Sequence, residues 1–587
     1  MILFSYKIFS SWLFYFMLGH FVLLTYLFWA NIKLAWEQFH QIDKKIWLML
    51  LVIFLFGFYL RNSEYFMGIH TDGFVAQESA NMWVAYGEYV KDCALGNYQE
   101  CQLFEQVLFP PGFPFLIVLS SFLFGLHSLS ASVISAVLSS LTIILVFLIS
   151  FLLFKKEQAA LYAALVFSLI PLNIINSQSG ESRPTGLFFI GLATLFYLLA
   201  IKNNRLLTWL LAASGVSYAI YVRQESYILV PLFLLFFLIF KWQAVKDFAK
   251  KIKEKAFDKK PIFSFLILGL TFLLLQVPVL RWLLMENPYT RSFSSHNLEY
   301  YKYIIIPIKY LAIHFFNLSP ADNALFHYNL IASIAFGAAI AFAFFRKNGK
   351  KEFYFLACLL GGYFIINSLM SLALETDVPT DYITGDYFRR TLIFHLPYAL
   401  LAGWGFYFLL PFKNKYFLLL SLIAIFLSLT FVNPIFLRSM TKEIKIEMAA
   451  NNFEFYFPPS LFEDARATKE GSYLLINPTT DYWRAMDKTP NGCLTISSTY
   501  MIALNDYFKN NQRKTVSMEL ISSATGYLFL EELKKNKCIT YLADYRCDDS
   551  YWGGKDFPCL FLKENLTFKP LFNEGKIKVF EAAFKVN

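Results

Sequence analysis

The first long polar stretch of the chain, residues 61–113, concentrates side chains that could do chemistry. It holds Asp72, several glutamates and two cysteines, and it ends with Pro110 and Pro111 just before the chain turns apolar again. Hydrocarbon penalises unpaired charge, so reactive polar groups of a membrane protein gather where its spans end. A carboxylate there can accept a proton from a hydroxyl group or bind a cation. Asp72 is therefore the first candidate for a catalytic residue, with a solvated connector carrying an incidental acid as the alternative.

Sequence motifs for several other chemistries are absent. The chain has no GxxxxGK[ST] phosphate loop, no GxGxxG after a strand, and neither HExxH nor GxSxG. ATP-driven, dinucleotide-dependent, zinc-protease and α/β-hydrolase activities therefore lack support. Acidic residues at a membrane surface remain as the candidate reactive groups.

Composition indicates the class of protein that must position these residues. The chain has 587 residues, of which 57% are hydrophobic and only 16% charged, and its mean hydropathy is +0.47. These values are typical of an integral membrane protein. The net charge of +10 comes from lysines in short loops between apolar runs, a pattern that sets membrane topology, so we expect no nucleic-acid partner.

Hydropathy predicts about twelve transmembrane helices, since each crossing needs roughly 20 apolar residues. The expected spans are 8–30, 46–60, 131–154, 158–176, 184–201, 206–222, 226–240, 261–284, 326–345, 353–373, 391–411 and 416–432. Residues 113–126 are apolar but too short, and we interpret them as a re-entrant or interfacial helix. The alternative is that this stretch does cross the membrane and that a second crossing elsewhere in the chain has not been recognised.

The loop from Lys241 to Lys260 fixes the expected orientation, because it holds eight lysines against three acids and should be cytoplasmic. Counting spans from it places the loop 61–113 outside the cell, together with everything after Asn433. The sequence thus predicts a multi-pass plasma-membrane protein whose active site and C-terminal domain are extracytoplasmic.

Two domains are expected: a membrane domain, 1–432, and a small α/β domain, 433–587. In the second, strands are predicted near 472–476, 493–497 and 538–543, and amphipathic helices near 499–509 and 524–537. This part carries four of the seven cysteines, without zinc-type CxxC spacing, which favours disulfides in an oxidising compartment.

Two disulfides are predicted from the positions of the cysteines. Cys547 and Cys559 are the closer pair in the C-terminal part, and Cys93 with Cys101 would close a short ring in the first loop. Two reduced cysteines are the alternative for the first-loop pair.

The order of motifs resembles a known superfamily. A span ending at Arg61, the stretch HTDGFVAQESA around Asp72, and FPPGFPFLIVLSSFLFG at 109–125 resemble the opening of the C-type glycosyltransferases. Members include the protein O-mannosyltransferases and the aminoarabinose transferases of lipid A. Their pattern is a catalytic Asp, often Asp-Glu, in the first external loop, then an amphipathic helix, a Pro-Pro turn and an apolar segment. Gly73 replaces the Glu here.

Three later stretches continue the likeness. They are SLIPLNIINSQSGESRP (168–184), which offers Glu181 as a second acid, YVRQESYILVP (221–231), and DYFRRTLIFHLPYALLAGWGF (386–406). The resemblance covers most of the chain, and its evidence is the ordered set of motifs.

The resemblance implies an inverting glycosyltransferase that moves a hexosyl or pentosyl unit from a polyprenyl (dolichyl or undecaprenyl) phosphate to a hydroxyl acceptor on protein, lipid or glycan. Asp72 would be the general base, and Glu181 a second catalytic acid. Cationic side chains would bind the donor phosphate, although each could instead be an interfacial anchor. The candidates are Arg223, Arg291, His296, Arg389 and Arg390.

Departures from the family pattern limit what the resemblance implies. Phe109 stands where the lipid A enzymes have a basic residue before Pro-Pro, which disfavours that substrate class. The sequence indicates no particular cofactor; a divalent metal is an open possibility, with Glu105 as a candidate ligand for a metal or a sugar. The rival functions are a secondary transporter and a non-catalytic scaffold with an extracytoplasmic cap, the latter because Gly73 interrupts the Asp-Glu pair.

Overall fold

The computed structural model describes part of the chain, and the account below refers to that part. The described ranges are 11–62, 110–124, 130–178, 180–253, 259–284, 330–345, 350–372, 391–410, 415–431, 492–497, 514–518, 526–543, 557–572 and 578–585, together with residues 9, 73, 76, 77, 79, 80, 83, 84 and 490. The predicted strand at 472–476 and the predicted helix at 499–509 lie outside them.

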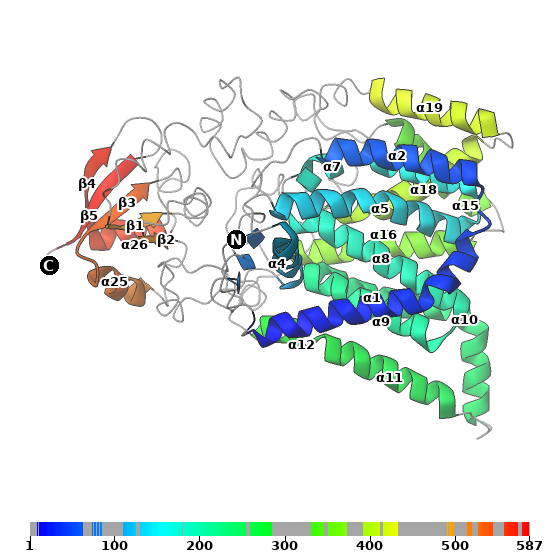
Figure 1. Ribbon diagram of the computed structural model, residues 1–587, viewed down its shortest axis with the longest axis horizontal. Coiled ribbons are helices and arrows are strands. Elements are labelled where there is room, and N and C mark those ends of the chain that lie inside the picture. Colours follow the sequence, from blue (N-terminus) through cyan, green and yellow to red (C-terminus); the bar gives the residue numbers. More distant parts are fainter. Residues whose placement is uncertain are drawn as a thin grey trace.

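The described residues up to Phe431 form a bundle of helices whose long members run side by side (Figure 1). The helices are α1 (Trp12–Phe39), α2 (Lys44–Asn62), α4 (Gly112–Phe124), α5 (Ser130–Phe154), α6 (Glu157–Ser168), α7 (Pro171–Gln178), α8 (Ser182–Asn203), α9 (Leu206–Val222), η3 (Gln224–Ile228), α10 (Leu229–Lys253), α11 (Lys259–Leu275), α12 (Val277–Leu284), α15 (Leu330–Phe345), α16 (Lys350–Leu372), η5 (Thr391–Phe394), α18 (His395–Leu409) and α19 (Lys415–Phe431).

Six helical segments within the described residues are long and apolar enough to cross a membrane. They are Trp12–Phe39, Lys44–Asn62, Ser130–Phe154, Ser182–Asn203, Gln224–Trp242 and Leu392–Leu409. The prediction of a helical integral membrane protein with several spans is therefore confirmed.

Two of the expected spans are each divided into two helices. The stretch predicted as 158–176 ends its first helix at Ser168 and resumes at Pro171, because proline has no N–H to continue the helical ladder and the residue before it disfavours helical angles. The stretch predicted as 261–284 is interrupted at Gln276, two residues before Pro278. Both breaks leave backbone groups that need other partners.

Burial divides the bundle into inner and outer helices. Helix α8 packs against α5 and α9, and α18 packs against α6 and α15, so these helices are covered on most sides. Helices α1, α2, α11 and α19 instead expose large apolar side chains, among them Trp29, Leu48, Leu274 and Tyr416. An exposed apolar face of this kind suits contact with lipid.

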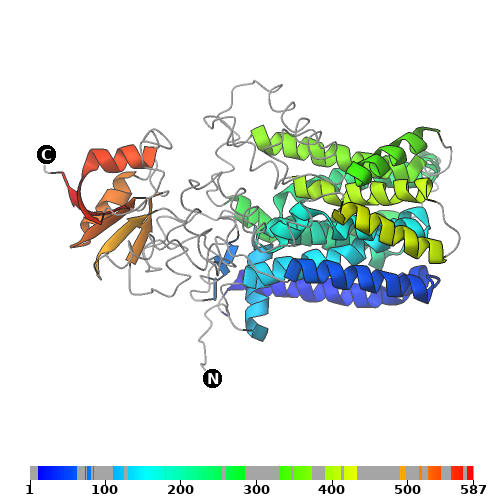
Figure 2. The same ribbon diagram turned by 90° about the horizontal axis from the view of Figure 1, so that it is seen from above.

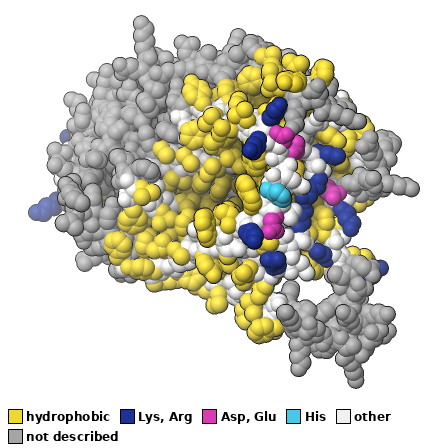
Figure 3. All heavy atoms as spheres, turned by 45° about the vertical axis from the view of Figure 1, so that its right-hand side comes forward, with side chains coloured by type: hydrophobic (Ala, Val, Ile, Leu, Met, Phe, Trp, Pro, Cys, Tyr) yellow, Lys and Arg dark blue, Asp and Glu magenta, His cyan; other side chains and the backbone are white. Residues whose placement is uncertain are grey.

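One end of the bundle gathers cationic side chains. Lys45 lies over the ring of Tyr416, Lys156 over that of Tyr407, and the Lys202 ammonium donates to the carbonyl of Leu152. Figure 3, which turns this end forward, shows the basic side chains beside a few acidic ones. The lysines that sequence analysis assigned to one side of the membrane thus lie together in space.

Helix α4 is oriented differently from the rest, since it runs across the opposite end of the bundle (Figure 2). It has 13 residues, too few to span a bilayer. Phe115 packs against Phe14 and Trp83, with ring centroids 5.9 and 6.3 Å apart, so an inward face of the helix is buried. This geometry suits an interfacial helix.

The C-terminal part contains a five-stranded sheet of order β2-β1-β3-β5-β4. Its strands are β1 (Leu494–Ser497), β2 (Lys514–Ser517), β3 (Ile539–Ala543), β4 (Leu566–Phe572) and β5 (Lys578–Phe584). Strand β1 pairs in parallel with β2 and β3, while β5 is antiparallel to β3 and β4. The predicted strands near 493–497 and 538–543 are β1 and β3.

Two helices supply the rest of the core of this sheet, α25 (Gly526–Lys534) and α26 (Phe557–Asn565). Phe529 and Leu533 of α25 are buried with Leu562 of α26 against the strands. Helix α25 corresponds to the amphipathic helix predicted at 524–537. Strands β2, β4 and β5 and helix α26 were not predicted.

The structure joins Cys493 to Cys538, which links the residues just before β1 and β3. Sequence analysis did not anticipate this pairing. Cys559 is also disulfide-bonded, while its predicted partner, Cys547, lies outside the described residues, as do Cys93 and Cys101.

Candidate functional site

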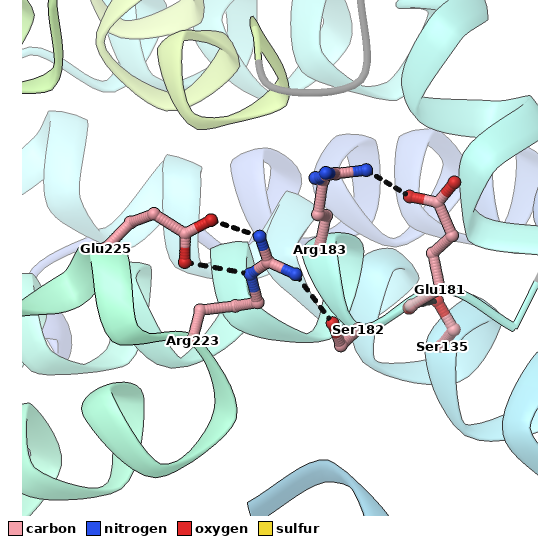
Figure 4. Close-up of polar contacts among 6 residues, drawn as sticks. All are labelled: Ser135, Glu181, Ser182, Arg183, Arg223 and Glu225. Atoms are coloured by element: carbon pink, nitrogen blue, oxygen red, sulfur yellow. Dashed lines mark hydrogen bonds and ion pairs between the residues drawn. The ribbon is translucent and has the colours of Figure 1, made fainter. Parts of the chain in front are cut away.

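Four charged side chains meet where helices α8 and α9 are joined to their neighbours, at the end of the bundle opposite the lysines (Figure 4). We call Glu181, Arg183, Arg223 and Glu225 the four-charge cluster. Nη1 of Arg183 donates to Oε2 of Glu181 at 3.2 Å. Nε of Arg223 donates to Oε2 of Glu225 at 3.0 Å, and Nη2 donates to the other oxygen of the same carboxylate.

The cluster is largely removed from solvent. The side chain of Glu181 is 1% exposed, and those of Arg183, Arg223 and Glu225 are 10–11% exposed. Ion pairs in such surroundings are screened less than surface pairs, so they respond strongly to any further charge. A ligand that carries a negative charge would therefore alter their pairing.

Local backbone geometry explains how the side chains converge. Glu181 is the N-cap of α8, and its carbonyl accepts a hydrogen bond from Oγ of Ser135 in α5 at 3.0 Å. Arg223 ends α9 with an extended backbone, φ −146° and ψ 120°, and Glu225 follows in η3, so both side chains belong to the same short connector. Nη1 of Arg223 also donates to Oγ of Ser182 at 3.1 Å, which links the ends of α8 and α9.

Gly186 makes room for Arg223. A Cβ atom at position 186 would lie 2.5 Å from Cγ of Arg223, so a larger residue here would displace the arginine stem. The aliphatic part of Arg223 thus packs directly on the first turns of α8.

A second buried arginine lies nearby in the fold but differs in its partners. Arg61, at the end of α2, is 0% exposed. Its Nε donates to Oγ of Ser139 at 3.1 Å, and Nη1 donates to the carbonyls of Gly57 and Ser168 at 3.1 and 2.9 Å. Nη2 donates to the carbonyl of Phe167 at 3.1 Å and to Oδ1 of Asn173 at 3.4 Å.

These bonds use all five N–H donors of the Arg61 guanidinium. The acceptors at Phe167 and Ser168 belong to the last turn of α6. Pro171 has no N–H for the usual helical bond to the Phe167 carbonyl, which accepts a long backbone bond of 3.5 Å from Ile170. A cation is also favoured at the C-terminal end of a helix. Arg61 therefore caps the broken span and fixes it to α2.

The described residues of the first loop are attached to the same end of the bundle. Oε1 of Gln77 accepts the N–H of Ala131 in the first turn of α5 at 3.1 Å, and Nε1 of Trp83 donates to Oγ of Ser11 at 2.9 Å. Residues 73, 76, 77, 80, 83 and 84 are helical and buried, and their spacing is that of one helix face. Gln77 lies five residues after Asp72.

The structure describes two of the predicted site residues, Glu181 and Arg223, and brings them into the same cluster. The remaining candidates lie outside the described residues: Asp72, Glu105, Arg291, His296, Arg389 and Arg390. Among the residues that are described, no group of three metal-ligating side chains occurs.

Sequence analysis did not single out Arg183 and Glu225. The signal that could have found them is an acid and an arginine two residues apart, which occurs in GESRP and again in VRQES. Since both stretches end or begin a predicted span, each pair should be partly buried and mutually neutralised.

Comparison with known families adds an independent observation. Residues 109–282, from the Pro-Pro turn to α12, match the family model described as dolichyl-phosphate-mannose-protein mannosyltransferase. The resemblance to the C-type glycosyltransferases is confirmed. The matched segment contains the whole four-charge cluster, so the family pattern and the buried charges fall in the same part of the chain.

Two solved structures have similar chains. One is ArnT from Cupriavidus metallidurans bound to undecaprenyl phosphate, with 11% identity, 92% of this chain and 98% of that chain covered, and a TM-score of 0.48. The other is the oligosaccharyltransferase AglB from Archaeoglobus fulgidus in complex with an inhibitory peptide and a dolichol-phosphate, with 12% identity, coverage of 92% and 74%, and a TM-score of 0.45. No curated protein matches the chain.

Proposed function

We propose that this protein is an inverting membrane glycosyltransferase that moves a sugar from a polyprenyl phosphate to a hydroxyl acceptor on protein, lipid or glycan. The observation that carries the proposal is the family match over 109–282, together with the buried arginines inside it. A lipid-linked donor needs no nucleotide site, in accord with the missing phosphate-loop motif.

The leaving phosphate is the first requirement of this reaction. It develops charge as the bond to the anomeric carbon breaks, and arginine forks bind phosphate oxygens in pairs. Arg223 offers such a fork at the end of a span, where the phosphate of a membrane-embedded lipid would lie. Arg291, His296, Arg389 and Arg390 are further candidates for this role.

A base that accepts the proton of the acceptor hydroxyl is the second requirement, and we assign it to Asp72. Support comes from the contact between Gln77 and Ala131, which anchors the first loop to the start of α5. Ser135, four residues later in α5, contacts Glu181. The loop that carries Asp72 is thus attached about one helical turn from the segment that carries the second acid.

The finer architecture is also part of the proposal: about twelve spans, a membrane domain at 1–432, and an α/β domain at 433–587 on the extracytoplasmic side. The lysine-rich end of the bundle supports this orientation. Labelling of single cysteines introduced at Ser63 and Asn451 tests it. Both should react with an impermeant reagent from outside intact cells, and reaction of only one contradicts the topology.

Transfer itself is tested on purified protein with radiolabelled polyprenyl-phosphate sugars and a membrane extract as the acceptor source. The parent protein should label one acceptor fraction, and Asp72→Asn should lower turnover by about 10² or more, because asparagine cannot accept a proton. Asparagine would serve almost equally well as a helix cap, so the substitution separates catalysis from structure. Glu78→Gln, which changes an acid six residues further along the same loop, is the matched control.

A further inference from the structure

The partner of Arg223 bears directly on how a phosphate could bind there. Glu225 takes the Nε and Nη2 edge of the guanidinium through both of its carboxylate oxygens. A phosphate group binds an arginine most strongly through two parallel hydrogen bonds of the same kind. The carboxylate and a phosphate would therefore compete for one edge.

The pairing of Arg223 with Glu225 is local, which argues against a role in holding the bundle together. The two residues are separated by one position, on the connector between α9 and α10. A staple between helices would join residues far apart in the sequence, as Ser182 and Arg223 do. Burying two charges is itself costly, so a buried ion pair is weak evidence for a stabilising role.

The connector between α9 and α10 would allow the Glu225 side chain to move while Arg223 stays in place. Glu225 lies in η3, a 3-10 helix of five residues, whose hydrogen bonds have poorer geometry than those of an α-helix. Arg223 is held separately, because Nη1 bonds Ser182 and its stem packs on Gly186. Release of Glu225 would leave the guanidinium where it is.

A second guanidinium can receive the displaced carboxylate. Arg183 belongs to the same cluster, where its guanidinium pairs with Glu181. A phosphate that binds the Nε and Nη2 edge of Arg223 would take the place of the carboxylate that accepts hydrogen bonds from this edge. Glu225 is the carboxylate that accepts two hydrogen bonds from one guanidinium.

We propose that Glu225 and the donor phosphate bind the same edge of Arg223, so that binding of a polyprenyl phosphate displaces Glu225 toward Arg183. The inference rests on the proposed function and deepens it, because it names Glu225 as a positioning residue that weakens phosphate binding. Glu225 also competes with the polyprenyl phosphate that remains after transfer, and so weakens the binding of this product. Glu225 would thereby favour release of the product.

Binding of a short-chain polyprenyl phosphate to the purified full-length protein in detergent tests this directly, without sugar transfer. Glu225→Gln removes the competing charge and should tighten binding about tenfold or more, since hydrogen bonds to charged groups contribute at this level. Polyprenol, which lacks the phosphate, should bind both proteins equally. Inorganic phosphate should show the same gain in the variant at weaker absolute affinity, which separates the headgroup from the lipid tail.

Two further variants secure the interpretation. Arg223→Gln combined with Glu225→Gln should lose the gain, and Glu157→Gln, at the lysine-rich end, should bind like the parent. If Glu225→Gln does not fold, Glu225→Asp keeps the negative charge on a shorter side chain. The Asp variant should pair less well with Arg223, so the protein should bind phosphate more tightly than the parent does.

The outcomes distinguish the two proposals. Unchanged or weaker phosphate binding by a folded Glu225 variant, beside a parent that binds polyprenyl phosphate, overturns the competition and leaves the glycosyltransferase proposal standing. A parent that binds no polyprenyl phosphate overturns both. In transfer assays, the competition predicts a lower inhibition constant for added polyprenyl phosphate in the Glu225→Gln protein, an effect that a merely structural glutamate would not produce.

Discussion

Arg61 and Arg223 are both buried arginines near the ends of spans, yet their surroundings differ in kind. Arg61 donates all five of its hydrogen bonds to neutral oxygens from α2, α5, α6 and α7. Arg223 donates to a carboxylate two residues away and to one serine of α8. The first arrangement joins four helices through neutral acceptors, whereas the second combines a charged partner in the same connector with a hydrogen bond to α8.

This difference indicates which arginine can take part in binding. Three of the five acceptors of Arg61 are backbone carbonyls that their helices hold in place, so most of its N–H donors cannot be offered to a ligand. A side-chain carboxylate can be exchanged for another anion, so the fork of Arg223 can be offered to one. Burial of a cation alone therefore does not mark a binding site; the mobility of its acceptors does.

The largest effect on stability is expected from Arg61→Gln. Glutamine offers two donors in place of five, which leaves carbonyls at the end of α6 unsatisfied at a cost of about 1–3 kcal/mol each. Thermal unfolding in detergent should show a clearly lower melting temperature for this variant. Arg61→Lys, with three donors, should have a melting temperature between those of Arg61→Gln and the parent. A melting temperature equal to that of the parent would mean that the five hydrogen bonds of Arg61 do not stabilise the fold.

The largest effect on donor binding is expected from Arg223→Gln combined with Glu225→Gln, since the double variant leaves no buried carboxylate without its partner. Loss of the arginine should raise the KM for the lipid-linked sugar about tenfold or more, while the melting temperature changes little because both charges of the local pair are removed together. Initial rates over a range of donor concentrations measure it. A large fall in melting temperature with an unchanged KM would make Arg223 resemble Arg61 and remove the contrast.

Gly57→Ala should disturb the surroundings of Arg61 less than replacement of Arg61 itself. The new Cβ would lie 2.3 Å from Cδ1 of Ile143 and 3.2 Å from Cβ of Ser168, so the Ile143 side chain must change its conformation or α2 must shift. Overpacking of this kind costs about 1–3 kcal/mol. Gly19→Ala in α1 is the control, because a Cβ added there would have no atom of the described residues within 4 Å. Equal melting temperatures for the two variants would show that the close approach is readily relieved.

Gly186→Ala should have the smallest effect, on donor binding alone. Its methyl group would push against Cγ of Arg223, 2.5 Å away, and shift the fork. We expect a rise of a few-fold in donor KM, while alanine in a helix adds roughly 0.5–1 kcal/mol of stability. Gly191→Ala in the same helix, whose nearest neighbour is 3.4 Å away, controls for helix propensity. Equal KM values for both variants would contradict the packing of Arg223 on α8.

The class of the protein, the positions of most helices and the gathering of lysines at one end could all be predicted from the order of residues alone. These features follow from local hydropathy and charge, because each span must match the bilayer thickness and positively charged loops stay on the cytoplasmic side. The order of family motifs also indicated Glu181 and Arg223. Even the break before Pro171 has a local cause, although the continuous apolar run around it led to the prediction of one span.

The partners of these residues, in contrast, depend on tertiary packing. Arg61 meets acceptors more than a hundred positions away at Phe167 and Ser168, and Cys493 pairs with Cys538 across 45 residues rather than with a nearby cysteine. Arg223 reaches Ser182 because α8 and α9 pack side by side. Such contacts could not be predicted, because a hydrophobic pattern specifies which face of a helix or strand is buried but not which neighbour covers it.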